Sequence, residues 1–367
     1  MILMDIRLDN IYSFKNFWMN MSYPRKVSTS TIPNEHLPNH SNFRYKKVNI
    51  IMGANASGKT SLGKALMHGF NLIARGDRVG FVDAIADSAE KAHFGVDIVF
   101  DASVLYRIDI VAYPVEEGNP LLRASIQQTA IGQNDSYEKC AARFDDYEKT
   151  LSSIDHEELE RIPQLSWLFG FALADEYGAS TRVSPKHERI LELVLKALDP
   201  AIEGVKKLNE VEDAYYITTK LGQTIIIEDG ELLKPERLSA GTREGLNVAN
   251  FISSIKGRRN AFYYSDEQFS LIHSDLEKAM LGVMVASLGD GDQLFFTTHN
   301  TDVLDLNLPK HSFTFLNKDI DDDFTPIQSI NASSLLKRNT DSLRMAVEND
   351  LFSTAPSLEY IYQIESL

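Results

Sequence analysis

The chain has 367 residues, 43% of them hydrophobic and 24% charged, which is typical of one large globular domain or two closely packed ones. Its 52 acidic and 37 basic residues give a formal net charge of −15, which argues against nucleic-acid binding through bulk positive charge. No secretory signal or membrane-spanning apolar stretch is evident, and a single cysteine cannot form an internal disulfide, so the cytoplasm is the expected compartment.

The first elements of the chain are predicted to be strands. Residues Ile2–Asn10 alternate well enough for a strand, and Tyr12–Phe17 continue in an extended or turning conformation. Residues Tyr23–Lys47 are polar and contain three prolines, so we expect an inserted loop on the surface. The apolar run Val48–Met52 then predicts a short strand.

A phosphate-binding loop follows this strand. Residues 53–60 read Gly-Ala-Asn-Ala-Ser-Gly-Lys-Thr, a complete G-x-x-x-x-G-K-[ST] pattern. Gly53 and Gly58 let backbone amides turn toward phosphates, and the helix expected over Ser61–Arg75 adds the positive end of its dipole. The alternative, an ordinary glycine-containing turn, is disfavoured because strand, loop and helix occur in the required order.

The side chains of this loop have separate expected roles. Lys59 should reach the β- and γ-phosphates of a nucleotide, and the Thr60 hydroxyl should hold Mg²⁺. The remaining residues expected to contact the nucleotide are Asn55, Ala56, Ser57 and Ser61.

After the phosphate loop the pattern changes twice. Residues His93–Phe100 and Val104–Tyr113 resemble antiparallel strands, and the pattern then turns helical from about Asp135 to Val211, with His187–Leu198 carrying an apolar face. We expect a helical lobe here, and its prolines and lack of a sustained heptad repeat exclude a long coiled coil. Cys140 lies in this lobe and is expected to be a small packing residue and not a nucleophile.

The last third of the chain contains two motifs near helix and strand ends. Ala214–Leu233 returns to strand character, with a hairpin turn at residues 228–230. Ser239 and Gly241 then precede a helix expected over Arg243–Ser254. A hydroxyl and a glycine at a helix start can bind a γ-phosphate, and read alone they are also a plain helix cap.

Two apolar strands that end in chemically active side chains follow. Residues 261–267 end in Asp266 and Glu267, a pair that a buried strand normally avoids. Asp266 could bind Mg²⁺ and Glu267 could act as a general base on water, while the alternative is an ordinary acidic strand end. Residues 293–300 carry His299, which could contact a γ-phosphate or be a hydrogen-bonded structural histidine.

These four motifs, in this order, resemble the ATP-binding-cassette (ABC) ATPases, in the branch that contains RecF, SMC, Rad50 and the overcoming-lysogenization-defect (OLD) proteins. Ile6–Phe17 resembles the opening strand pair of that branch, and Asp266–Leu276 resembles its D-E-x-x-x-x-L-H-x-x-L stretch, with Ile272 in place of the first leucine. His273 stands where transporter cassettes carry the D-loop aspartate. The signature Ser-Ala-Gly-Thr is similar to that of small OLD-like antiphage-defence ATPases without a Toprim domain.

The resemblance implies an α/β fold of the ABC type, with a mixed sheet, an antiparallel β subdomain and an inserted helical lobe. The implied divisions are an N-terminal ATPase part, a helical lobe, a C-terminal ATPase part and a helical tail, at residues 1–130, 131–215, 216–330 and 331–367. The implied ligands are ATP and Mg²⁺. Gln127 and Gln128 are candidates for the family's Q-loop glutamine by position only.

The resemblance also implies an assembly. In the family, the signature of one subunit caps the nucleotide held by another, so Ser239 and Gly241 should act in trans. The active form would be a homodimer or a higher dimer-based oligomer with ATP at the interface.

ATP hydrolysis is the only chemistry that the sequence predicts. The stretch after His299 is short for a Toprim nuclease domain, and the acidic cluster Asp319, Asp321, Asp322 and Asp323 is better explained as a solvated hairpin turn. An ATPase without arms or a nuclease is expected to work through a partner. The leading hypothesis is an ATP-driven sensor or scaffold that controls a separately encoded effector, such as a nuclease or toxin, in bacterial antiphage defence.

Two alternatives stay open at this point. One is a RecF-like repair ATPase that clamps DNA, for which Lys256, Arg258 and Arg259 form the only compact basic cluster near the predicted ATPase motifs. The other is an ATP-binding scaffold that does not hydrolyse ATP, which the presence of Glu267 disfavours.

Overall fold

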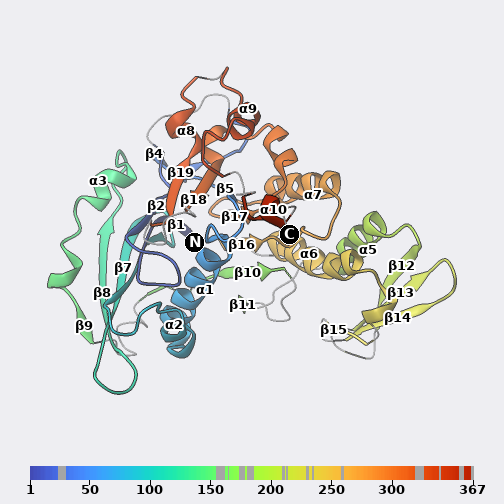
Figure 1. The fold of residues 1–367 in the computed structure, drawn as a ribbon, viewed down its shortest axis with the longest axis horizontal. Coiled ribbons are helices and arrows are strands. Elements are labelled where there is room, and N and C mark those ends of the chain that lie inside the picture. Colours follow the sequence, from blue (N-terminus) through green and yellow to red (C-terminus); the bar gives the residue numbers. More distant parts are fainter. Residues whose placement is uncertain are drawn as a thin grey trace.

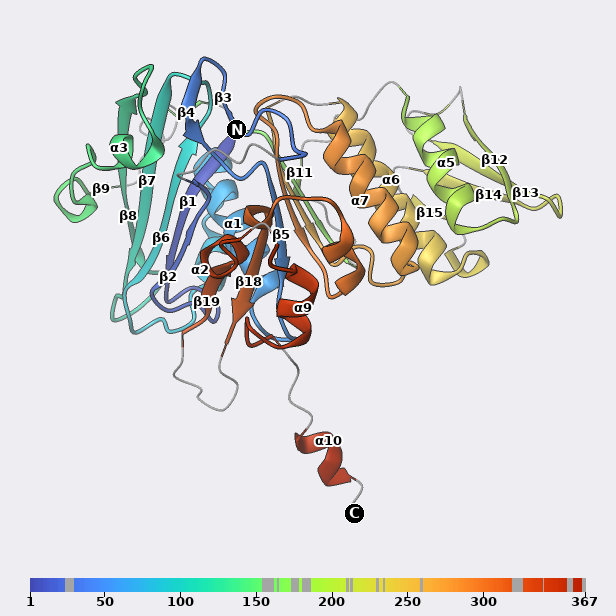
Figure 2. The same ribbon diagram turned by 90° about the horizontal axis from the view of Figure 1, so that it is seen from above.

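Two large β-sheets with a helix between them form the body of the chain, and a third, small sheet lies at one end (Figures 1 and 2). The computed structural model describes residues 1–23, 30–153, 162–163, 165–172, 178–179, 186–208, 211, 214–228, 231–233, 235–257, 260–318, 326–338, 340–354 and 359–364.

The first large sheet is antiparallel throughout. Its six strands lie in the order β2-β1-β6-β7-β8-β9, and each pairs antiparallel with its neighbour. The strands are β1 (Ile2–Asp9), β2 (Phe17–Asn20), β6 (Ala92–Val99), β7 (Val104–Tyr113), β8 (Leu121–Ala130) and β9 (Ser152–Ser153). The expected opening strand pair is present as β1 and β2, and the expected pair of later strands as β6 and β7.

The second large sheet carries the phosphate loop. Its order is β11-β10-β16-β17-β5-β18-β19, with five central parallel strands and an antiparallel strand at each edge. The strands are β5 (Val48–Met52), β10 (Trp167–Phe171), β11 (Gly178–Ala179), β16 (Phe262–Asp266), β17 (Gln293–Thr297), β18 (Phe313–Asn317) and β19 (Gln328–Asn331). The mixed sheet and the antiparallel subdomain of the expected fold class are therefore both present.

The small sheet is antiparallel and packs against helix α5. Its strands are β12 (Ile202–Lys207), β13 (Tyr215–Thr219), β14 (Thr224–Glu228) and β15 (Glu231–Leu232), and a separate hairpin joins β3 (His36–Leu37) to β4 (His40–Arg44). Glu228 lies opposite Glu231, as a hairpin requires, while residues 229 and 230 of the predicted turn lie outside the described residues.

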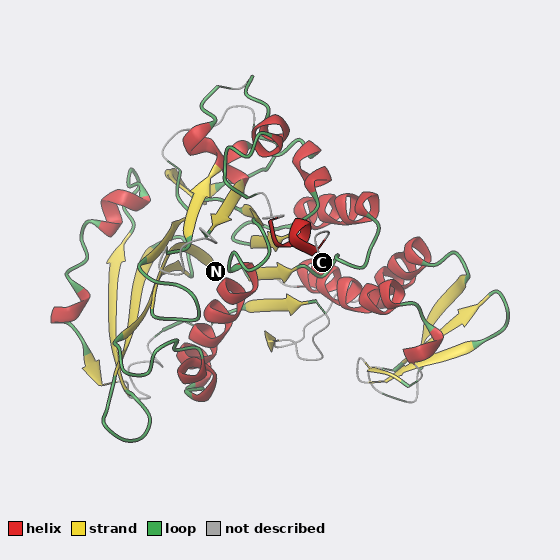
Figure 3. Cartoon of the chain, in the orientation of Figure 1, coloured by secondary structure: helices red, strands yellow, loops and turns green. Residues whose placement is uncertain are grey.

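The described helices are few and mostly short. Of the four longer ones, α1 lies between the two large sheets, and α5, α6 and α7 gather beyond the second sheet (Figures 1 and 3). The α-helices are α1 (Lys59–Arg75), α2 (Val79–Asp83), α3 (Tyr137–Ala141), α5 (His187–Leu198), α6 (Ala240–Gly257), α7 (Ser274–Ser287), α8 (Ala332–Leu335), α9 (Leu343–Glu348) and α10 (Glu359–Ile364). Short 3₁₀ helices are η1 (Tyr147–Lys149), η2 (Pro235–Arg237), η3 (Thr301–Asp305) and η4 (Lys310–Ser312). No helix of the described chain is long and apolar enough to cross a membrane.

The central strands are apolar on both faces because both faces are covered. In β16, Phe262 and Tyr264 belong to the core that contains α1, whereas Tyr263 belongs to the core that contains α5, α6 and α7. A third, smaller core fills the space between the first sheet, the β3–β4 hairpin and α3. Burial on two faces explains why the strands read as continuous apolar runs in the sequence.

Helix α1 approaches both large sheets so closely that glycine is required along it. A Cβ atom on Gly69 would lie 2.2 Å from the ring of Phe94, which is buried in β6. We expect Gly69→Ala to lower the free energy of unfolding by about 1–3 kcal/mol through overpacking. The matched control is Gly282→Ala in α7, where a Cβ atom meets nothing within 4 Å; it should stabilise the chain by about 0.5–1 kcal/mol.

Denaturant unfolding of both variants measures this difference. Stabilisation by both alanines would contradict the close packing of α1 against β6.

The expected helical lobe over residues 131–215 is wrong as a description of the whole segment. It contains α3, η1 and α5, but also strands β9, β10, β11 and β12. The run Trp167–Phe171 is a fully buried strand that pairs in parallel with β16, and a short apolar run of this kind cannot be distinguished from a helical segment by periodicity. The expected boundary at residue 215 also divides the small sheet, because β12 pairs with β13 across it.

The expected surface loop at residues 23–47 is partly correct: among its described residues, Thr31, Asn34 and Ser41 are exposed, but the segment also forms a hairpin with buried side chains. Phe43, Tyr45 and Lys47 are buried, and the β3–β4 hairpin contributes to the third core. His311 Nε2 lies 2.7 Å from Glu35 Oε1, both side chains being buried, and this contact fastens the segment to η4. The polar composition of the segment therefore reflects buried polar partners as well as solvent.

The expected C-terminal helical tail begins as part of the body. Ala332, Leu343 and Phe352 lie in the largest core, and Phe352 stacks on Phe315 with ring centroids 3.9 Å apart. Helix α10 projects from the body in Figure 2, and its Ile361 is exposed. The acidic cluster at residues 319–323 and the basic residues Arg258 and Arg259 lie outside the described residues.

Candidate nucleotide-binding site

The phosphate loop connects the carboxyl end of β5 to the start of α1. Ala56 has a φ of 63° and Gly58 a φ of 97°, so both residues have a left-handed backbone conformation. Glycine adopts this conformation without strain, which explains the glycine at position 58. A Cβ atom on Gly53 would lie 2.5 Å from the carbonyl oxygen of Leu316. Gly58 is covered by Phe14 and Ile327, so both glycines of the motif are required by the packing of the loop.

Lys59 closes the loop on itself. Its buried Nζ donates to the carbonyl oxygens of Gly53 at 2.9 Å and Ala54 at 3.1 Å, and it lies 3.5 Å from Glu267 Oε1. Burial lowers the pKa of Lys59, and the nearby Glu267 carboxylate opposes that shift. The loop therefore holds an ammonium group at its centre through backbone oxygens.

Asp266 is held between the phosphate loop and the neighbouring strand. Its Oδ2 accepts from Thr60 Oγ1 and its Oδ1 accepts from Thr297 Oγ1, both at 2.7 Å. Burial raises the pKa of Asp266, and the two hydroxyl hydrogen bonds oppose the shift. The predicted pair, Thr60 and Asp266, is thus in direct contact.

Glu267 is the first residue after β16 and has an unusual backbone. Its φ is 49°, and its N–H donates to Thr297 Oγ1 at 3.0 Å. A non-glycine residue in this region is strained, and such strain concentrates at functional sites. The strand end therefore turns the Glu267 side chain toward the phosphate loop.

His299 completes the contacts of Glu267. His299 Nε2 lies 2.8 Å from Glu267 Oε1, and its side chain is 41% exposed. The hydrogen bond from His299 is the largest cause that lowers the pKa of Glu267, and the charge of Lys59 adds to it. Glu267 is therefore kept as a carboxylate between two nitrogen groups.

Ser239 and Gly241 lie at the start of α6. Ser239 Oγ accepts from the Thr242 N–H at 3.1 Å, so the helix-cap interpretation of this serine is correct for the isolated chain. A Cβ atom on Gly241 would lie 2.8 Å from the carbonyl oxygen of Leu271. Among the described residues, no hydrogen bond joins Ser239 to the phosphate loop of the same chain.

Solved structures with a similar fold include SMC head domains and RecF. An SMC head bound to the C-winged helix domain of ScpA aligns with a TM-score of 0.52 at 13% identity, covering 92% of this chain and all of that one. The Smc head domain with an extended coiled coil, bound to the C-terminal domain of ScpA derived from Pyrococcus furiosus, aligns at 0.50 and 11% identity, covering 92% and 98%. A RecF structure aligns at 0.42 and 10% identity, covering 89% and 98%.

The chain has the fold of an SMC head domain. Its sequence matches no family model and no curated protein. At these identities the likeness shows the fold alone, so the function has to be argued from the site itself.

The fold also places the two Q-loop candidates, Gln127 and Gln128, and the residue at the expected D-loop position, His273. Gln127 and Gln128 lie on β8 of the antiparallel sheet, not in the sheet with the phosphate loop, and the Gln127 amide is bound to the backbone of Asp145. The hydrogen bonds of Gln127 go to Ser125, Asp145 and Thr150, and none of those described joins it to the phosphate loop. His273 caps α7 by accepting from the Asp275 N–H, and its side chain is 71% exposed.

Cys140 is buried in α3, as expected of a packing residue. Burial raises the pKa of its thiol to about 11, which disfavours a nucleophilic role.

Sequence reasoning missed two side chains that shape the site. Thr297 joins Asp266 to the Glu267 backbone, and Tyr264 donates its hydroxyl hydrogen to the carbonyl oxygen of Lys59 at 2.7 Å. Thr297 lies opposite Asp266 in the parallel pairing of β16 and β17. The rule that ligands bind at the carboxyl ends of parallel strands was the signal that could have identified Thr297.

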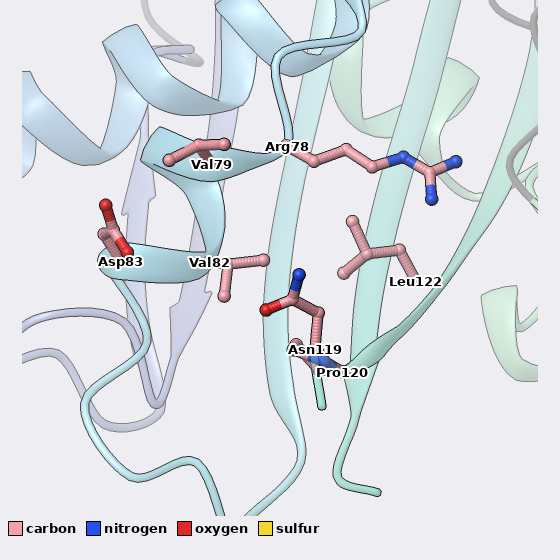
Figure 4. A pocket seen from close by; sticks show the side chains of 7 residues that line it. All are labelled: Arg78, Val79, Val82, Asp83, Asn119, Pro120 and Leu122. Atoms are coloured by element: carbon pink, nitrogen blue, oxygen red, sulfur yellow. The ribbon is translucent and has the colours of Figure 1, made fainter. Parts of the chain in front are cut away.

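A separate pocket lies between α2 and the turn that joins β7 to β8, and has a volume of about 220 Å³. Figure 4 shows Val82 and Leu122 directed into it. It is lined by Arg78, Val79, Val82, Asp83, Asn119, Pro120 and Leu122. None of these residues belongs to the phosphate loop or its contacts.

The chemistry of the candidate site fits a nucleotide with Mg²⁺. Ser57 Oγ is buried in the loop and has no hydrogen-bond partner among the described residues, so it is a donor available to a phosphate. Thr60 and Asp266 supply the oxygen ligands that Mg²⁺ prefers. In the described part of the chain, no cluster of three histidine, cysteine or acidic side chains offers a different metal site.

Proposed function

We propose that the chain binds ATP with Mg²⁺ at the loop of residues 53–60 and hydrolyses it. The observation that supports this most strongly is one set of contacts: Lys59 and His299 both approach Glu267, while Thr60 contacts Asp266. Side chains from two other segments, the end of β16 and the residues after β17, thus meet at the phosphate loop. A structural ion pair would not require a lysine inside a glycine-bounded loop.

The proposed roles follow from the contacts. Lys59 and the loop amides bind the phosphates, and Asn55, Ala56, Ser57 and Ser61 line the loop. Thr60 and Asp266 hold Mg²⁺, which when bound neutralises developing charge on the phosphates. Glu267 accepts a proton from the attacking water, and His299 orients Glu267 and contacts the γ-phosphate.

The binding of phosphate competes with the contacts of the free site. Lys59 contacts two backbone oxygens and lies 3.5 Å from Glu267, so phosphate oxygens must replace these partners. Glu267 is then released from Lys59 while His299 still holds it. In this proposal nucleotide binding itself frees the general base.

We further propose that two copies bind two ATP molecules between them. At the start of α6, Ser239 is exposed and Gly241 is half-buried, and within the described chain they make no hydrogen bond to the phosphate loop that they would serve. A second copy can bring this helix start to the nucleotide, where its dipole and the serine hydroxyl would bind the γ-phosphate.

Mixing two inactive variants tests this arrangement. Ser239→Arg should block the signature and Lys59→Ala the phosphate loop, so each alone should hydrolyse almost no ATP. In an equal mixture, half of the pairs combine one of each and retain one intact site, so we expect about a quarter of the wild-type rate. A mixture that stays inactive, or full activity of Ser239→Arg alone, would contradict action in trans.

The biological role that we propose is an ATP-driven sensor or scaffold that controls a separate effector protein in antiphage defence. It rests on the resemblance of the sequence to small OLD-like ATPases, and on the SMC heads of the comparison, two of which are bound to parts of ScpA. Expression together with the neighbouring genes should protect bacteria in a plaque assay, and Lys59→Ala should remove the protection. Equal protection by Lys59→Ala would contradict an ATP-driven role.

A further inference from the structure

Glu277, a buried carboxylate outside the four sequence motifs, contacts the two neighbours of His299 in the chain. Glu277, in α7, is 5% exposed. Its Oε1 accepts from Thr298 Oγ1 at 2.5 Å, and its Oε2 accepts from Asn300 Nδ2 at 2.8 Å. The two residues that flank His299 are therefore bound by the two oxygens of a single side chain.

The segment around His299 has few other anchors. β17 ends at Thr297 and η3 begins at Thr301, so residues 298–300 belong to neither element. The Thr298 N–H donates to the carbonyl oxygen of Ile51 at 3.3 Å, and Asn300 Nδ2 also donates to the carbonyl oxygen of Ser274 at 3.3 Å. Asn300 Oδ1 caps η3 by accepting from the Asp302 N–H at 2.9 Å. The Asn300 N–H donates to Thr298 Oγ1 at 2.9 Å, and this same hydroxyl donates to Glu277. Glu277 is thus the shared anchor of this segment.

Packing alone does not explain a carboxylate at this position. Burial raises the pKa of Glu277, and the titratable side chains that also act on it are Asp302, which raises it, and His299, which lowers it. None of the groups with the largest influence on its pKa is a lysine or an arginine. Burying a carboxylate without a cation is costly, and an apolar side chain would serve packing better. A carboxylate differs from an apolar side chain here because it accepts hydrogen bonds from both Thr298 and Asn300.

We propose that Glu277 is a positioning residue for ATP hydrolysis, which holds both neighbours of His299 and thereby keeps His299 in contact with Glu267. This inference rests on the proposed ATPase function. Glu277 touches neither Glu267 nor the phosphate loop in the described hydrogen bonds and ion pairs, so its effect must pass through His299.

Kinetics of the purified full chain provide the first test. Glu277→Ala should lower kcat about tenfold, because a misplaced catalytic group loses rate. The dissociation constant for ATP should change less than about twofold, since Glu277 contributes no contact to the phosphate loop. Glu277→Gln should restore most of the rate, because its amide oxygen can still accept from Asn300 and its amide nitrogen can donate to Thr298. Val283→Ala, on the exposed face of α7, is the control and should keep the wild-type kcat.

A double-mutant cycle distinguishes positioning from a general loss of stability. In a His299→Ala background, Glu277→Ala should cause no further loss of kcat. Losses that add fully, or a Glu277→Ala enzyme with wild-type kcat, would overturn the proposal.

Hydrogen exchange without nucleotide tests the same inference independently of activity. In Glu277→Ala, the amides of Asn300 and Asp302 should exchange at least about tenfold faster than in the wild type, while those of β17 stay protected. Glu277→Met gives the same test if Glu277→Ala does not fold, because it keeps a side chain of similar length and removes both acceptor oxygens while leaving the Thr298 hydroxyl in place. Unchanged exchange at Asn300 would overturn the proposal. If Glu277→Ala exchanges faster than the wild type but the wild type hydrolyses no ATP, the result would instead contradict the proposed function.

Discussion

Replacing Lys59 with alanine is expected to weaken ATP binding by at least about 100-fold, because two or more charge-assisted hydrogen bonds are worth about 3 kcal/mol together. Lys59 is buried in the loop and already makes two hydrogen bonds to backbone oxygens, so its ammonium is preorganised at the centre of the phosphate loop. Isothermal titration of the chain with ATP and Mg²⁺ measures the effect.

Lys64→Ala is the matched control. Lys64 lies on the same helix but is exposed, and we expect its replacement to leave ATP affinity within about twofold of the wild type, as is usual for exposed charges. Tight ATP binding by Lys59→Ala would contradict the phosphate-loop assignment. Equal losses in both variants would indicate a general electrostatic effect of positive charge.

Replacing Glu267 with glutamine is expected to lower kcat by about 10²–10⁴-fold, the usual contribution of a general base. ATP binding should be retained or strengthened, because the amide no longer competes with the phosphates for Lys59. Single-turnover hydrolysis and a separate binding titration measure the two effects. Glu348→Gln, in α9 and mostly exposed, should keep the wild-type rate.

The pH dependence of the wild-type kcat/KM, which reports groups of the free enzyme, tests the same role of Glu267. The hydrogen bond from His299 and the charge of Lys59 lower the pKa of Glu267. A base with a lowered pKa stays ionised as pH falls, so the step that needs the Glu267 carboxylate should persist below the pH at which an ordinary glutamate protonates. His299→Ala removes the largest cause of the shift and should move the acidic limb to higher pH. An acidic limb that does not move would contradict this coupling.

The parts of the fold that are local in sequence could be predicted. The strand before the phosphate loop, helix α1, and the strands that end near Asp266 and His299 each have a complete pattern of their own. Helix α1 begins two residues before the expected Ser61, and α6 extends three residues beyond each end of the expected Arg243–Ser254. Both helices were therefore predicted with nearly correct bounds.

The parts that depend on pairing could not be predicted. The run Trp167–Phe171 becomes a strand because β16 offers it a parallel partner in the central sheet. Glu35 and Phe43 are buried because the one pairs with His311 and the other packs in the third core, next to the first sheet. In the site, Thr297 acts only because β17 lies beside β16 in a register that sets it opposite Asp266. Glu277 is likewise connected to His299 through the packing of α7 and not through sequence spacing.

The solution mass of Glu267→Gln, measured with and without ATP and Mg²⁺, tests most directly whether ATP joins two copies of this chain. Blocked hydrolysis should trap the nucleotide between them, so we predict growth from a smaller species to a dimer-based one only when ATP and Mg²⁺ are present, with ADP failing to replace ATP. A mass that is the same with and without ATP would contradict an ATP-driven association of the two copies.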